Sequence, residues 1–176
     1  MAIQTRKLSA NNPRLIIDLR EMFNGKQPDS TSFRASVGQS ILDQIRDRTA
    51  EFIGQDGKRF RNYSKDYAKS LEFKAFGKSK NSPNLELTGD MLGLMDILES
   101  NKNQIVIGWA DSSQAEKAHG HITGSVGVTR DFFGLPDGSY DSIASEFKPL
   151  TNTEEPDSLF NRASLILLRD LFSGEN

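Results

Sequence analysis

The 176-residue sequence contains no cysteine, only two histidines and a single tryptophan. The lack of cysteine excludes disulfides, thiolate metal ligands and cysteine nucleophiles. No apolar run approaches the roughly 20 residues that cross a bilayer, and residues 1–12 lack the apolar stretch of a secretion signal. We therefore expect a chain without a membrane segment that stays in the cytoplasm of the cell that makes it.

Sequence signatures of common catalytic sites are missing too. The chain has no internal repeat, no phosphate-binding loop ending in Gly-Lys-Ser/Thr, no GxSxG element and no HExxH element. Ser112 and Ser113 lack the glycine-flanked turn that a hydrolase serine needs. With 36% apolar and 26% charged residues, the composition is that of an ordinary globular domain. We expect a protein without catalytic activity and without a cofactor.

Charge is unevenly distributed along the chain. Residues 1–80 carry 16 Lys/Arg against 9 Asp/Glu, a balance of +7, whereas residues 81–176 carry 6 against 15, a balance of -9. The basic residues are densest in 58–80, where aromatic residues are interleaved among them: Lys58, Arg59, Arg61, Lys65, Lys69, Lys74, Lys78 and Lys80. Such a segment is either a solvated face whose rings fill the core, or a surface that contacts DNA or an acidic partner.

Helical periodicity is clearest after residue 35. Val37, Ile41, Ile45 and Thr49 recur at helical spacing, which predicts a long amphipathic helix that ends at Gly54. Between residues 92 and 109, two apolar stretches flank a polar turn at 100–103, which predicts a β-hairpin with Trp109 as a core anchor. Short helices are expected after Ser112, with a serine as N-cap, and over residues 135–148.

These elements predict an α+β fold, in which a small antiparallel sheet packs against the long helix. Residues 1–35 are expected to form an N-terminal arm outside the core, and 36–148 the core domain. Residues 149–176 are expected to be a linker and an apolar C-terminal helix, which packs on its own domain or on a neighbouring chain.

Both histidines lie in the stretch KAHGHITGSVGVTRDFFG, residues 117–134. In an extended backbone His119 and His121 would point to the same side. A zinc site would need a third ligand, and no acidic residue lies at a recognisable spacing, so we expect no bound metal. The glycines favour a connecting loop that carries contact residues. Phe132 and Phe133 are expected to divide between the core and a partner, because adjacent residues of an extended segment face opposite ways.

An ordered series of weak motifs spans residues 37–147. The long helix is followed by QDGKRF, the basic segment, LELTGDML, IVIGWAD, KAHGHITG and finally RDFFGL, residues 130–135. In this order and spacing the chain resembles bacteriophage virion-morphogenesis proteins of the tail-completion and neck type. It departs from their pattern in lacking prolines before Arg130 and a Tyr-Ala pair before the first histidine.

The resemblance implies a structural subunit of a homo-oligomeric ring at the head-to-tail junction of a virion. Implied partners are copies of itself, portal-adaptor or tail-tube proteins, and DNA in transit. Opposite charges on two faces would suit contacts between non-identical surfaces. The candidate interface residues are Arg130, Phe132, Phe133, His119, His121, Lys58, Arg59, Arg61, Lys65 and Lys69. A DNA-contacting protein that uses residues 58–80 is the alternative.

Overall fold

A computed structural model describes residues 2–77, 85 and 89–148 of the chain. Its elements run β1 (Gln4–Lys7), β2 (Arg14–Asp18), α1 (Leu19–Met22), α2 (Thr31–Ala50), a 3-10 turn (Tyr67–Lys69), α3 (Leu71–Ala75), α4 (Asp90–Gly93), β3 (Met95–Asn101), β4 (Gln104–Trp109), α5 (Ser112–Thr123) and α6 (Asp137–Phe147). The fold is α+β, with a four-stranded antiparallel sheet packed against the 20-residue α2, as the sequence predicts.

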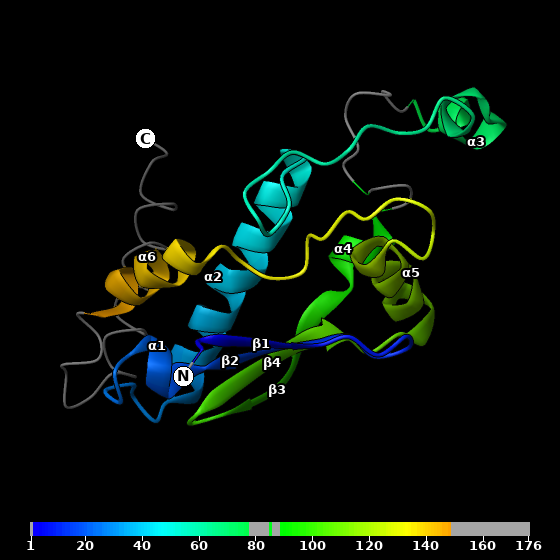
Figure 1. Ribbon diagram of the computed structural model, residues 1–176. Coiled ribbons are helices and arrows are strands. Elements are labelled where there is room, and N and C mark those ends of the chain that lie inside the picture. Colours follow the sequence, from blue (N-terminus) through cyan, green and yellow to red (C-terminus); the bar gives the residue numbers. More distant parts are fainter. Residues whose placement is uncertain (1, 78–84, 86–88, 149–176) are drawn as a thin grey trace, which may run out of the picture.

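The sheet has the order β1-β2-β4-β3. Strands β3 and β4 form the predicted hairpin, with a register shift between Ile97 and Glu99 that marks a β-bulge. The helix α2 crosses one face of the sheet, with α6 on one side of α2 and α5 on the other (Figure 1). The core lies between these layers, and its apolar side chains include Leu15, Ile17, Phe33, Val37, Ile41, Ile45, Ile105 and Ile107.

The prediction that residues 1–35 are an arm outside the core is wrong. Strand β2 pairs with β4 over five positions and lies inside the sheet. Leu15 and Ile17 are fully buried, and so is Leu19 at the start of α1. The alternating burial of Arg14–Asp18 is that of a strand with one covered face, but five residues are too short a stretch to distinguish it from an amphipathic turn.

The predicted stripe of α2 is confirmed, because Val37, Ile41, Ile45 and Thr49 are all buried. The helix begins at an N-cap, where the Ser30 hydroxyl accepts a hydrogen bond from the N–H of Phe33. It ends at Ala50 rather than at Gly54, and the chain turns at Phe52, whose φ is +66°.

Gly38 sets how closely α2 approaches the sheet. It is buried on the sheet-facing side of the helix, and a Cβ at this position would collide with the side chain of Ile97 in β3. A glycine inside a helix lowers its stability by about 1 kcal/mol relative to alanine. At this position, the close contact between helix and strand offsets that cost.

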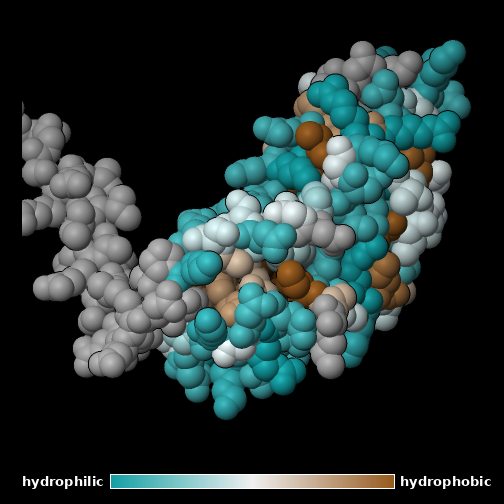
Figure 2. All heavy atoms as spheres, turned by 60° about the vertical axis from the view of Figure 1, so that its left-hand side comes forward, coloured by the Kyte–Doolittle hydropathy of each residue, from teal (hydrophilic) through white to brown (hydrophobic). Residues whose placement is uncertain are grey.

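The basic aromatic segment projects from this body. After α2 the chain runs away from the sheet to α3, which lies at the far end of the projection (Figure 1). We call residues 61–77 the extension. The face of the molecule in Figure 2 is mostly hydrophilic, with small and separate hydrophobic areas. None of the helices in the described ranges is long and apolar enough to cross a membrane.

Two predicted features lie outside the described residues. These are the linker with its C-terminal helix, 149–176, and the end of the basic segment at Lys78 and Lys80. The helix expected over 135–148 is confirmed as α6, where Ile143 and Phe147 are buried on one face.

Candidate interaction site

Three aromatic rings hold the extension together. Tyr63, Tyr67 and Phe73 lie with ring centroids 5.2–5.5 Å apart in tilted and edge-to-face arrangements. The hydroxyl of Ser70 caps α3 by accepting a hydrogen bond from the N–H of Phe73. Each aromatic pair is worth about 0.5–1.5 kcal/mol beyond its buried area. This cluster orders a segment that has few other described contacts with the body.

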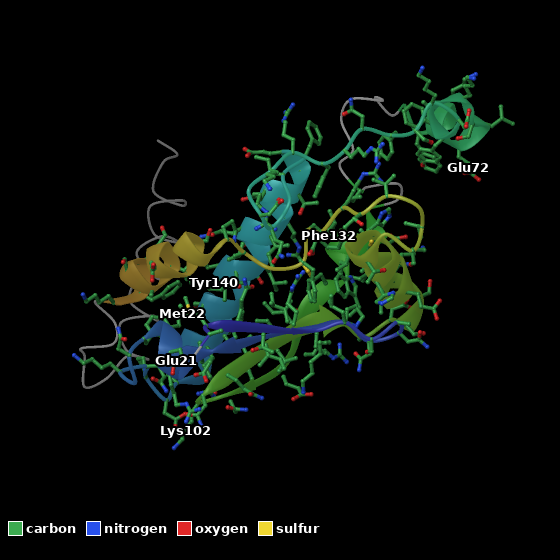
Figure 3. The ribbon with its side chains drawn as sticks, viewed as in Figure 1. Glu21, Met22, Glu72, Lys102, Phe132 and Tyr140 are labelled. Atoms are coloured by element: carbon green, nitrogen blue, oxygen red, sulfur yellow. The ribbon has the colours of Figure 1, made fainter. Side chains whose placement is uncertain are left out.

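Two large apolar side chains of the extension are exposed instead of joining the cluster. Leu71 is 85% exposed and Phe76 is 52% exposed. Both belong to α3 or its C-cap, next to Glu72, which Figure 3 shows at the tip of the projection. Exposed apolar groups on a projecting element mark a surface that can be covered by another protein.

The basic candidates are solvent-exposed, the first two in the turn after α2 and the others on the extension: Lys58, Arg59, Arg61, Lys65 and Lys69. Lys58 forms an exposed ion pair with Asp56, and the guanidinium of Arg59 lies 5.7 Å from the ring centroid of Phe52. Tyr63, Tyr67 and Phe73 pack on one another, which does not favour stacking of bases on these three rings. Contact of the lysines with phosphates is compatible with this arrangement.

A cavity of about 380 Å³ lies where the extension meets α5 and the loop that follows it. Its described walls combine apolar side chains with cationic and imidazole groups, and no carboxylate is among the described lining residues. The positive or titratable lining residues are Lys117, His121 and Arg130.

Arg130 is buried, with 6% of its surface exposed, and its side chain lines the cavity. Its guanidinium donates hydrogen bonds to the carbonyl oxygens of Arg61 and Asn62, at 3.2 and 3.4 Å. It also lies 4.8 Å from the ring centroid of Tyr63. Burial lowers the pKa of Arg130 from its usual value and raises that of Tyr63. Arg130 therefore fastens the base of the extension to the loop after α5.

The expectation that Phe132 and Phe133 divide between core and partner is wrong, because both are fully buried. Their ring centroids lie 6.2 and 4.9 Å from that of Trp109, and Figure 3 shows Phe132 inside the body. The alternation rule applies to paired strands, whereas residues 131–136 form no strand and bend so that both rings reach the core.

The histidines lie on α5 rather than in a loop. Successive helical residues are about 100° apart, so His119 and His121 point to different sides and do not form a joint centre. Asp111 serves as N-cap in place of the predicted serine, and the helix continues through Gly120 to the left-handed Gly124, with φ of +81°. Within the described part of the chain, no three His, Asp or Glu side chains gather where a metal ion could bind.

A polar network joins β1 to the segment that carries the two phenylalanines. Arg6 forms an ion pair with Asp131 at 2.7 Å and also donates to the carbonyl oxygen of Phe133. Arg48 donates to the carbonyl oxygen of Phe132, and burial lowers its pKa to about 10. Because Arg6 belongs to the basic half of the sequence and Asp131 to the acidic half, the fold interleaves the two halves here.

No family model, no curated protein and no solved structure matches this chain.

Sequence reasoning identified Arg130 and the basic segment, but it did not place them together. Nor did it identify Leu71 and Phe76 as exposed, or the cavity beside α5. One sequence signal did indicate an additional structure here: the chain between α2 and the hairpin is much longer than a short connection needs.

Proposed function

We propose that this protein is a structural subunit of a homo-oligomeric ring at the head-to-tail junction of a bacteriophage. The observation that carries the proposal is the projecting extension, ordered by its own aromatic cluster and bearing exposed Leu71 and Phe76. The order of motifs from Val37 to Phe147 supplies the resemblance to neck and tail-completion proteins.

The extension is suited to contact a neighbouring subunit. It carries two exposed large apolar side chains and several exposed cationic ones, the kinds of residue that form the anchor and the rim of a protein interface. A ring uses one surface of each subunit against a different surface of the next, and a projecting element supplies one such surface. An isolated extension would leave Leu71 and Phe76 in water, whereas ring formation would bury them.

The test compares the association of the full-length parent with that of Leu71→Asp and Phe76→Asp variants by sedimentation velocity. If either residue is an interface anchor, its loss weakens association by about 2 kcal/mol, or roughly 30-fold. Leu94→Asp is the matched control, because Leu94 is as exposed as Phe76 and lies outside the extension. The thermal melts of all variants should equal that of the parent.

Two results would contradict the proposal. One is parent protein that stays monomeric at every concentration; the other is association that neither extension variant weakens. A DNA-contacting role predicts instead that Lys65→Glu and Lys69→Glu reduce duplex binding and its steep salt dependence. That outcome without any rings would favour the DNA-contacting alternative.

A further inference from the structure

The cavity beside α5 has the chemistry of a site for an acidic and apolar peptide. Leu85, Met91, Val126 and Val128 supply apolar walls, and the rings of Tyr63 and Tyr67 close one side. Its volume of about 380 Å³ falls in the range of ligand pockets. An occupant therefore needs an apolar side chain to fill this space.

Two cationic side chains line that apolar space, and none of the described residues that line it carries a negative charge. The guanidinium of Arg130 donates two hydrogen bonds to the carbonyl groups of Arg61 and Asn62, and no carboxylate in the described ranges forms a salt bridge with it. Lys117, on the exposed rim, has a described contact only with the side-chain oxygen of Gln114 at 3.5 Å. A carboxylate entering the cavity would meet both cations, in surroundings that strengthen the attraction.

The sequence supplies one segment with the matching chemistry. Residues 154–160 read EEPDSLF, three carboxylates and, after one serine, two large apolar side chains, and they lie outside the described residues. We propose that the cavity binds residues 154–160 of a neighbouring copy of this chain. The inference deepens the ring proposal, on which it rests, by naming a contact between adjacent subunits.

The distance between the end of α6 and the cavity favours a segment from a neighbouring copy over a segment from the same chain. Phe147 at the end of α6 packs on Phe33 in the first turn of α2, 6.0 Å between ring centroids. Arg46, near the other end of α2, donates to the carbonyl oxygen of Leu92, beside the cavity. The helix rises about 20 Å between Phe33 and Arg46.

Glu154 and Glu155 of the same chain would have little slack over that distance. The six residues from Lys148 to Glu154 span about 20 Å only when fully extended. They would have to run straight along the body and still enter the cavity. Figure 1 shows α6 and α5 on opposite sides of the molecule, in agreement with this separation. A segment from the next subunit is free of this constraint.

The chain has no cysteine, so two introduced ones report on a single contact. Full-length Lys117→Cys protein is mixed with full-length Glu155→Cys protein under mild oxidation, and the products are separated on a non-reducing gel. We expect a covalent dimer in at least tenfold higher yield than from the control pair of Lys102→Cys with Glu155→Cys. Lys102 is also exposed and lies in the β3–β4 turn, at the end of the sheet away from α5 (Figure 3).

Charge exchange gives a second, independent measurement. Lys117→Glu should weaken association of the full-length protein, and Glu155→Lys in the same chain should restore part of it. Equal dimer yields from the two cysteine pairs would overturn the inference. So would a disulfide that forms only within a chain carrying both cysteines, because the segment would then occupy its own cavity.

These results separate the inference from the function on which it rests. Rings of the parent protein without the specific disulfide would leave the ring proposal standing and contradict the cavity assignment. The specific disulfide without rings would support the cavity assignment and contradict the ring proposal.

Discussion

Replacement of Phe133 by alanine tests the buried position of the RDFFGL segment most sharply. The ring is fully buried and its centroid lies 4.9 Å from that of Trp109. Deletion of a buried phenylalanine ring costs about 3–5 kcal/mol, because the transfer free energy is lost and a cavity remains. For a domain of this size each kcal/mol lowers the Tm by about 2–4 °C, so the melt should fall by about 6–20 °C.

The assay is urea unfolding followed by the fluorescence of Trp109, with Phe76→Ala as the matched control. Phe76 is half exposed on the extension, so its loss should change the unfolding free energy by less than about 1 kcal/mol. Phe132→Ala should resemble Phe133→Ala, because it is equally buried. If either core variant unfolds at the urea concentration of the parent, then that ring is not buried and one of the pair is available for a partner.

Three further predictions concern packing and charge. Gly38→Leu should lower the unfolding free energy by about 1–3 kcal/mol, because the new side chain would displace Ile97. Gly93→Leu is the control and should cause no such loss, because the space around Gly93 is open. The urea midpoints of the two variants measure the difference, and equal midpoints would refute the close contact at Gly38. Arg6→Ala should lower the unfolding free energy by about 1 kcal/mol or less, because the ion pair between Arg6 and Asp131 is partly exposed. The loss, measured by urea unfolding, should be smaller in 1 M salt, which screens the ion pair. A loss that does not depend on salt would show that Arg6 stabilises the fold by packing. Ring association should weaken when salt rises from about 0.05 to 1 M, as seen by sedimentation velocity; association strengthened by salt would show that apolar contacts dominate.

Periodic patterns carried most of the fold prediction. The stripe from Val37 to Thr49 is long enough to indicate a helix and its buried face, and alternation around Ile105 and Ile107 indicates the returning strand. Such patterns work because one face of each element is buried. They specify α2 and the hairpin without any knowledge of the neighbours.

Strand β1 could not be predicted from such a pattern. The sequence of β1, QTRK, has no apolar alternation, so nothing local indicates a strand. It is held by pairing with β2 and by long-range hydrogen bonds: the Gln4 amide donates to the carbonyl oxygen of Leu135, and the Tyr140 hydroxyl bonds to Gln4. Contacts between residues more than 130 positions apart leave no periodic trace in the sequence.

Some residues of the candidate site were predictable, but their arrangement was not. Arg130 was identified by its motif, yet its burial depends on carbonyl groups of Arg61 and Asn62 from a distant segment. Exposure of Leu71 follows from the projection of α3 away from the body, and such a position is set by tertiary structure alone. The basic character of the extension, in contrast, follows directly from the number of Lys and Arg residues in its sequence.

The ring at a virion neck is tested most directly by locating the protein in phage particles. Particles made from the genome that encodes this chain would be labelled with gold-conjugated antibody against the full-length protein and imaged by electron microscopy. We predict label at the head-to-tail junction, and separate heads and tails when the gene is deleted. Complete infectious particles without the gene, or label elsewhere on the virion, would contradict the proposed function.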